Sequence, residues 1–142
     1  MSDQLLPTAP IDAEYDIPEA FVYETQPSLT YKLNINTDTF NGYVDELEAY
    51  KQTVYKILNT ERYEYIIYSW NHGVELKNLF GQPIPYVVPE LERRITEALM
   101  QDDRTVSVTD FQFDTSKFGV VAVTFKANSI YGETEQQLTV EI

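Results

Sequence analysis

Residues 53–81 read TVYKILNTERYEYIIYSWNHGVELKNLFG. The apolar spacing at the start of this stretch predicts a helix that ends near Thr60. Residues 64–68 are rich in aromatic and β-branched side chains, which predicts a buried strand followed by a turn at residues 69–73. A short helix over residues 74–80 should come next, and the glycine that closes the quoted stretch should stop it.

On the N-terminal side, the chain predicts a strand and then the helix. Apolar and polar residues alternate over residues 29–35, the period of a half-buried strand, and a loop over residues 36–42 should end it. Asp45 followed by Glu48 resembles a capping box at the start of the helix. We expect the helix to place one set of side chains on its apolar face: Leu47, Tyr50, Val54, Ile57 and Leu58.

On the C-terminal side, prolines punctuate the route to a second long helix. Pro83 and Pro85 predict an extended crossing, and Pro89 suits the first position of the helix. Acidic and basic side chains should look outward from this helix. Its inward face should consist of Leu91, Ile95, Ala98 and Leu99.

Three strands should close the chain, over residues 106–113, 120–127 and 134–142. In the first, the phase of the apolar residues reverses after Val108, so we expect a β-bulge near Asp110. The other two alternate regularly between apolar and polar side chains.

These elements predict an α+β fold in a single domain over residues 29–142, with the helices packed on one face of a mixed or mainly antiparallel sheet. Residues 1–28 contain four prolines and several acids but no Lys or Arg, which predicts an extended acidic arm. Its apolar residues favour an arm that docks on its own domain or on a neighbour. A freely solvated terminus is the alternative.

Composition excludes several classes of partner. Ten Lys and Arg stand against 23 Asp and Glu, which gives a formal charge of −13, and so we expect neither nucleic acid nor an anionic membrane as a partner. The chain has no cysteine, which is compatible with a reducing cytoplasm. No stretch approaches the length of a membrane span, and the first residues lack the features of an export signal. The 11 tyrosines fit either protein interfaces or sheet edges.

No catalytic or cofactor site is indicated. Carboxylate pairs carry little information in so acidic a chain, and no acid lies in an apolar stretch that would raise its pKa for glycosidase chemistry. His72 is the only histidine, so a two-histidine metal site is excluded. No glycine-rich phosphate loop is present. We therefore predict a protein that is not an enzyme and has no cofactor and no metal.

Two motifs resemble a known family: residues 60–81 of the opening stretch, and RITEALMQDDR at residues 94–104. They are similar to the gene 25-like baseplate wedge proteins of contractile tails, and the PBSX-type branch of phages and contractile bacteriocins fits best. A baseplate component of type VI secretion systems is related. Much of the family reads Glu-Pro-Arg where this chain has Asp102, Asp103 and Arg104, so only the arginine is kept.

The resemblance implies that both motifs contact larger wedge proteins. Asp102, Asp103 and Arg104 end a helix, where acids oppose the helix dipole and need compensation. They either form a polar latch for a wedge subunit or satisfy one another locally. The second implied contact is formed by Arg62, Trp70 and His72. A tryptophan packed over the core beside a tight turn at Gly73 is the alternative there.

The last strand is the candidate for contact with the tail sheath. Alternation continues to the last residue, so an edge with unpaired backbone groups is expected, and such edges accept partner strands. The residues concerned are Leu138, Thr139, Val140, Glu141 and Ile142. The end of the domain in this family resembles the handshake region of the sheath protein. An edge covered by the N-terminal arm is the alternative.

Taken together, the resemblance implies a structural subunit of a baseplate that binds larger wedge proteins and initiates the sheath. It also implies six copies per ring, hub or tube-proximal proteins as further partners, assembly in the host cytoplasm and residence in a virion or tailocin particle. Two other functions are the alternatives: a tail-associated peptidoglycan-cleaving enzyme similar to lysozyme, and an acidic adaptor for a host protein.

Overall fold

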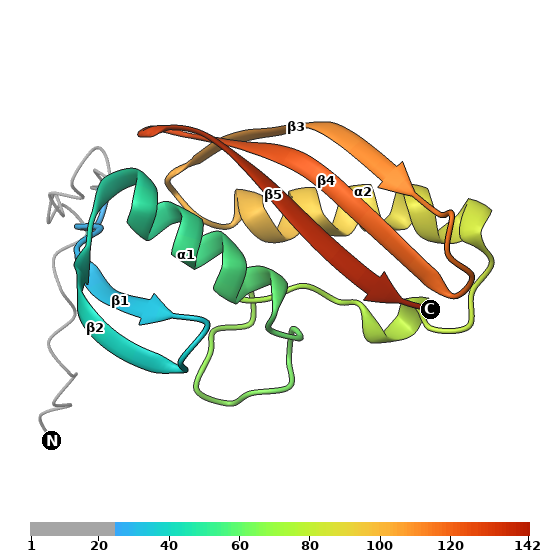
Figure 1. The fold of residues 1–142 in the computed structure, drawn as a ribbon, viewed down its shortest axis with the longest axis horizontal. Helices are drawn as coiled ribbons and strands as arrows, with labels where there is room; N and C mark the ends of the chain where they lie inside the picture. Colours follow the sequence, from blue (N-terminus) through green and yellow to red (C-terminus); the bar gives the residue numbers. More distant parts are fainter. Residues whose placement is uncertain (1–24) are drawn as a thin grey trace, which may run out of the picture.

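The computed structural model describes residues 25–142, which form one α+β domain. All strand pairs in this part of the chain are antiparallel, and they form two sheets, β1-β2 and β3-β4-β5. In chain order the elements are β1 (Thr30–Asn34), β2 (Thr39–Val44), α1 (Glu46–Leu58), the 3-10 turn η1 (Lys77–Leu79), α2 (Ile84–Met100), β3 (Thr105–Asp114), β4 (Val120–Ser129) and β5 (Gly132–Glu141) (Figure 1).

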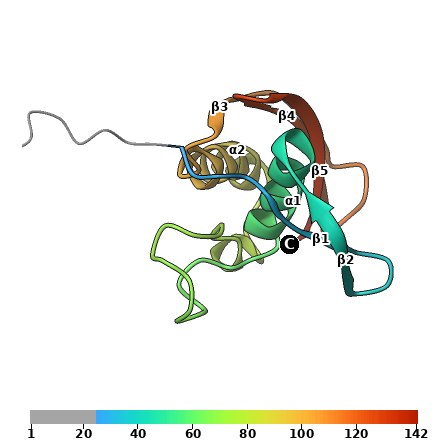
Figure 2. The ribbon, with the colours of Figure 1, turned by 90° about the vertical axis from the view of Figure 1, so that its left-hand side faces the viewer.

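Both helices pack on one face of the three-stranded sheet, as predicted (Figure 2). Residues of the predicted arm that precede residue 25 lie outside the described residues. The predicted inward faces of the helices are confirmed except for Leu47, which is only partly buried. The central strand β4 supplies Val121, Val123, Phe125 and Ala127, all fully buried, which alternate with partly buried residues as a sheet with one core face requires.

Helix α1 begins at the predicted cap but without the capping box. The Asp45 carboxylate accepts a hydrogen bond from the backbone N–H of Glu46 at 2.8 Å. Glu48 instead forms an ion pair with Lys51 one turn later, at 2.9 Å. Ser28 also takes part in capping the helix, because its hydroxyl donates to Asp45 and accepts from the N–H of Glu46.

The prediction of a loop over residues 36–42 is wrong, since β2 begins at Thr39 and pairs with β1 in a hairpin. The predicted apolar face of β1 is also wrong: Leu29, Tyr31 and Ile35 are exposed and only Leu33 is partly buried. The hairpin lies below α1 in the view of Figure 1, as a separate sheet. The side chain of Gln52 on α1 supports it by bonding the N–H of Leu33 and the carbonyl of Tyr31, both at 2.8 Å.

Helix α2 starts five residues before the predicted position. Pro83 is the N-cap and Pro85 lies in the first turn, where the N–H groups need no partner within the helix, so proline is tolerated there. The predicted extended crossing is therefore wrong, and Pro89 lies inside the helix. The inward face was still predicted correctly because it follows from periodicity and not from the start of the helix.

The C-terminal strands follow the prediction closely. The register of β3 against β4 shifts between Thr109 and Gln112, and Asp110 has a φ of +57°, which confirms the bulge. A second shift between Thr105 and Ser107 leaves Val106 exposed. β5 pairs with β4 through ten consecutive residue pairs without any shift, and it forms one edge of the sheet.

The largest correction concerns residues 61–76. The predicted buried strand over residues 64–68 is instead an exposed loop without strand pairing. The predicted helix over residues 74–80 is reduced to the three residues of η1. The two ends of the loop meet in an isolated parallel bridge between Glu61 and Val74.

Candidate interaction surfaces

The loop of residues 62–73 is held at its base by several contacts with the core. The N–H of Arg62 bonds the carbonyl of Val74 at 3.2 Å, and the N–H of Val74 bonds the carbonyl of Thr60 at 3.0 Å. The carboxylate of Glu61 accepts hydrogen bonds from the N–H groups of Leu76 and Lys77. These contacts make the loop an Ω-loop, with its ends close together and its middle projecting from the domain.

Arg62 joins this base to α2. Its Nη1 lies 3.3 Å from a carboxylate oxygen of Glu97, and its side chain is largely buried. The Nε atom of Arg62 is buried and has no hydrogen-bond partner within the described residues. Arg62 thus serves mainly as an internal support of the loop.

The middle of the loop exposes an unusual amount of apolar surface. Trp70 is 82% exposed, and its ring meets that of Tyr63 edge to face at 6.1 Å between centroids. A hollow of about 400 Å³ lies within the loop. We call this surface the apolar loop, made by Tyr63, Tyr65, Ile66, Ile67, Tyr68 and Trp70. Contiguous exposed apolar surface of this kind marks a site of protein association.

Asp102 and Arg104 satisfy each other. Arg104 donates from Nε and Nη2 to the two oxygens of the Asp102 carboxylate, at 3.0 and 2.8 Å, and its backbone N–H donates to the same group at 2.9 Å. The side chains are only 14% and 10% exposed. Arg104 also donates to the hydroxyl of Thr53 on α1, at 3.0 Å. The exposed Asp103 is the member of the motif that faces outward.

The environment of this pair fixes its charge state. Burial works to raise the pKa of the Asp102 carboxyl, but the hydrogen bonds from Arg104 outweigh it and hold the pKa below its ordinary value. Beneath the pair, the hydroxyls of Tyr50 and Thr105 are buried and lie 2.8 Å apart. The guanidinium lies over the Tyr50 ring at 5.9 Å from its centroid. The Asp102–Arg104 pair is therefore an integral part of the folded domain at the end of α2.

The structure brings the two motifs together. A cavity of about 150 Å³ is lined by Ser69, Asn71 and His72 from the loop and by Gln101 and Asp102 from the end of α2. His72 stacks on Tyr68 with ring centroids 4.4 Å apart. Burial, together with the nearby charge of Lys56, lowers the pKa of His72, so its imidazole is neutral at neutral pH.

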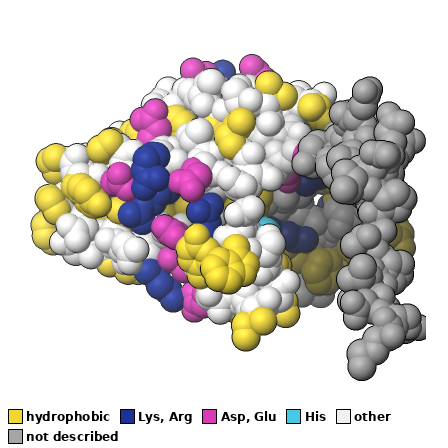
Figure 3. Space-filling model, turned by 180° about the vertical axis from the view of Figure 1, so that it is seen from behind, with side chains coloured by type: hydrophobic (Ala, Val, Ile, Leu, Met, Phe, Trp, Pro, Cys, Tyr) yellow, Lys and Arg dark blue, Asp and Glu magenta, His cyan; other side chains and the backbone are white. Residues whose placement is uncertain are grey.

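Charged side chains surround these surfaces. On the face shown in Figure 3, basic and acidic side chains lie side by side next to groups of exposed hydrophobic side chains. On α2, Arg93 pairs with both Glu90 and Glu97, and Arg94 pairs with Glu90 at 3.1 Å. Arg94 also donates to the carbonyl of Glu75 at 2.8 Å, which ties the helix to the end of the loop.

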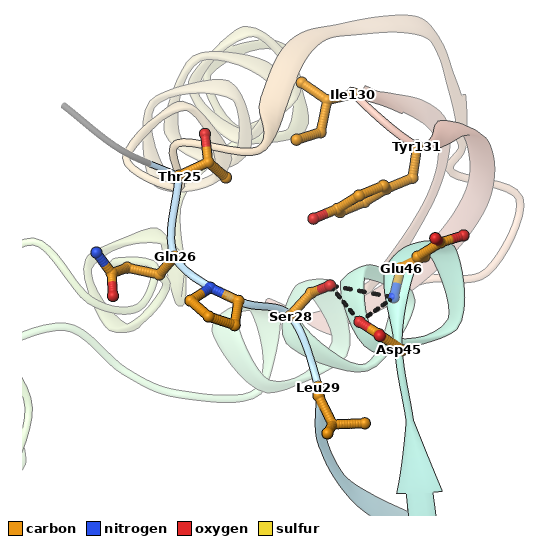
Figure 4. A pocket seen from close by; sticks show the side chains of 9 residues that line it. Thr25, Gln26, Ser28, Leu29, Asp45, Glu46, Ile130 and Tyr131 are labelled. Carbon is orange, nitrogen blue, oxygen red and sulfur yellow. Dashed lines mark hydrogen bonds between the residues drawn. The ribbon is translucent and has the colours of Figure 1, made fainter. Parts of the chain in front are cut away.

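The first described residues, 25–29, lie beside the start of α1 and the Arg104 motif. Figure 4 shows residues 25–29 along one side of a hollow of about 600 Å³, with the start of α1 and the turn at Ile130 and Tyr131 on its other sides. A smaller hollow of about 300 Å³ on this segment is lined by Asp103 and Arg104. The last residues of the predicted arm, 26–28, thus border the Arg104 motif.

Sequence reasoning missed several contributors to these surfaces. Thr53, which holds Arg104, lies outside both motifs, and Glu97, which holds Arg62, lies within the second motif but has no predicted role. The exposed ring of Tyr31 was missed because alternation predicts burial, and those of Phe40 and Tyr43 because no second strand was predicted there. Glu61 was within a quoted motif but was given no role.

The part of the chain from residue 25 onward contains no group of three or more His, Cys, Asp or Glu side chains that could hold a metal ion. None of its helices is both long enough and apolar enough to cross a membrane.

Comparison with known proteins identifies a family and a relative. The family model described as "contractile injection system sheath initiator" matches residues 28–132. The phage-like element PBSX protein XkdS of Bacillus subtilis (strain 168) is 43% identical over 100 residues, which cover 68% of this chain and 70% of that protein. Both motifs, the apolar loop and strands β1 to β4 lie within the matched residues of the family.

Proposed function

Because the chain belongs to the family of contractile injection system sheath initiators, we propose that it links the larger wedge proteins of a baseplate to the first ring of the tail sheath. Its role is structural and sheath-initiating, and the resemblance to baseplate proteins of PBSX-type tails is confirmed. The observation that carries the proposal is the family match over residues 28–132, since it spans most of the domain.

The surface for the wedge proteins is formed by the apolar loop and the neighbouring Asp102, Asp103 and Arg104. Support comes from the exposed Trp70, because large exposed aromatic side chains are enriched in protein interfaces. Arg104 acts mainly by holding Asp102 and the end of α2 in place, and Asp103 offers an exposed carboxylate. Arg62 and His72, at the two ends of the loop, help to hold it in place.

The surface for the sheath is the outer edge at the end of β5, from Leu138 to Glu141, together with Ile142 that follows it. The matched residues of the family end at Gly132, where β5 begins, so this step is supported by the open edge of the sheet. An edge strand without a strand partner accepts an additional strand through its backbone groups.

Several finer features belong to the same proposal. Six copies per ring, contacts with hub or tube-proximal proteins, assembly in the host cytoplasm and residence in a virion or tailocin particle follow from a baseplate position. We also propose that residues 1–28 act as an arm beside a baseplate domain of residues 29–142. In this proposal the protein works by binding other proteins, and it needs neither catalysis nor a cofactor. Nucleic acid and membrane are not among its partners.

Affinity capture from cells that assemble the particle tests this assignment. We expect the wild-type chain to recover wedge and sheath proteins. The variant Trp70→Ala should lose the wedge proteins, whereas Phe118→Ala, which truncates an even more exposed side chain between β3 and β4, should not. A chain that ends after Leu138 should lose the sheath protein, provided that circular dichroism shows an intact fold. Recovery of no tail protein by the wild-type chain would refute the proposal.

A further inference from the structure

The hydrogen bonds between β4 and β5 fix which backbone groups of β5 point away from the sheet. The N–H of Ile142 donates to the carbonyl of Gly119 at 2.8 Å, and these two residues stand opposite each other. Direct partners that exchange hydrogen bonds alternate along an antiparallel pair with partners that do not. Because the register is unbroken from Gly132 to Glu141, every second residue presents its N–H and C=O outward: Glu133, Glu135, Gln137, Thr139 and Glu141.

These five side chains are all exposed on the open face of the sheet. The helices pack on the opposite face. The alternate residues of β5 are buried or partly buried instead, with Val140 4% exposed. An added strand would therefore place its directly paired side chains beside the same five residues.

The other edge of the sheet is a poorer acceptor. β3 changes register twice against β4, and Asp110, at the shift between Thr109 and Gln112, adopts a left-handed conformation. Bulges of this kind twist an edge strand and discourage strand addition. The unbroken edge of β5 is thus the one suited to receive a strand over ten residues.

The outward row on β5 is strongly acidic. Glu133, Glu135 and Glu141 form no ion pair with any of the described residues. The one basic residue directly opposite this row on β4 is Lys126, across from Glu135, and its Nζ is paired with Asp110 at 3.4 Å. Like charges placed directly opposite in a sheet are unfavourable and opposite charges are favourable, so this row selects the charge of the incoming strand.

We propose that β5 receives a strand of the tail sheath protein that carries Lys or Arg at alternate positions and apolar residues between them. The basic side chains pair with Glu133, Glu135 and Glu141 on the open face. The apolar side chains lie beside Leu138, Val140 and Ile142 at the margin of the core. This inference rests on the proposed sheath contact and adds the chemistry of the partner strand.

Two variants separate the charge of the strand from strand addition itself. Glu133→Lys/Glu141→Lys reverses the row, and Glu48→Lys/Glu92→Lys makes the same change of net charge at exposed positions on the two helices. Thr139→Pro removes an outward N–H and leaves the bonds to β4 intact, which edge strands tolerate, and Thr139→Ala is its control. Affinity for the purified sheath protein of the same particle is measured by calorimetry at low and physiological salt.

We expect the row-reversed variant to bind at least about tenfold more weakly, the helix variant to bind like wild type, and Thr139→Pro to lose binding. Wild-type affinity should fall as salt rises. If the row-reversed variant binds like wild type and Thr139→Pro does not bind, the basic strand is refuted and the sheath contact stands. If Thr139→Pro binds like wild type, the sheath contact on β5 is itself refuted.

Discussion

Gly73 lies so close to Thr60 that no side chain fits between them: a Cβ atom on Gly73 would stand 2.5 Å from the carbonyl oxygen of Thr60. The φ of Gly73 is +98°, a region that residues with a side chain rarely adopt. Since the neighbouring Val74 donates its N–H to the same carbonyl, this contact closes the apolar loop. A glycine is required here by both conformation and space.

We predict that Gly73→Ala destabilises the protein by at least about 2 kcal/mol, because a left-handed residue costs about 1–2 kcal/mol and the clash with Thr60 adds to it. Gly81→Ala is the matched control, since Gly81 has a φ of +77° but open space around a Cβ atom. Urea denaturation of both variants measures the difference. Equal losses would show that the contact with Thr60 contributes nothing.

Arg104 is the second position where a conservative change should matter. Arg104→Ala leaves Asp102 buried without its partner, and we expect a loss of about 3 kcal/mol in the free energy of unfolding. Arg104→Lys keeps the charge but cannot reach both oxygens of Asp102 and the hydroxyl of Thr53 at once, so it should recover only part of that stability. Full recovery by lysine would mean that charge alone matters at this site.

The same pair predicts how stability responds to acid. The pKa of Asp102 is lower in the folded protein than its ordinary value of 3.8, because hydrogen bonds from Arg104 outweigh burial. The stabilisation is therefore fully present above about pH 3.8 and is lost as the pH falls through the folded pKa.

We expect Asp102→Asn to be less stable than wild type at neutral pH and to show a shallower loss of stability in acid. The difference in slope cannot exceed about 1.4 kcal/mol per pH unit for one group. Denaturant titrations between neutral and acidic pH check this, with Asp38→Asn in the hairpin turn as the control. Parallel curves for Asp102→Asn and wild type would contradict the prediction.

Sequence periodicity predicted the parts of the fold whose side chains face the core. Leu91 and Ile95 on α2 and the alternation of β4 are examples, because burial imposes a period on each element. The bulge at Asp110 was predictable for the same reason, since the core face must be kept when the register shifts.

Periodicity failed where apolar residues do not face the core of this chain. Ile66 and Ile67 are as apolar as a buried strand, so composition could not distinguish a core element from a surface made for a partner. The same holds for Tyr31 and Phe40 on the hairpin. The partner of Arg104 was likewise unpredictable, because the sequence allows it to meet Asp102, Asp103 or another subunit.

The apolar loop gives a last prediction that separates stability from binding. Ile66 and Ile67 gain nothing from burial in the isolated chain, since both are almost completely exposed. We therefore expect Ile66→Ser/Ile67→Ser to change the free energy of unfolding by less than about 0.5 kcal/mol. Ile95→Ser, at a fully buried position, should instead cost several kcal/mol, because it leaves a cavity and buries a hydroxyl.

The loop variant, although stable, should be the one that fails to capture wedge proteins. The double loop variant should lose them while folding normally, because the lost apolar area belongs to the interface and not to the core. Thermal unfolding and affinity capture are measured on the same preparations. A loop variant that unfolds much more readily than wild type would indicate that the loop packs on its own domain, and normal capture of wedge proteins by a folded loop variant would move the wedge contact elsewhere.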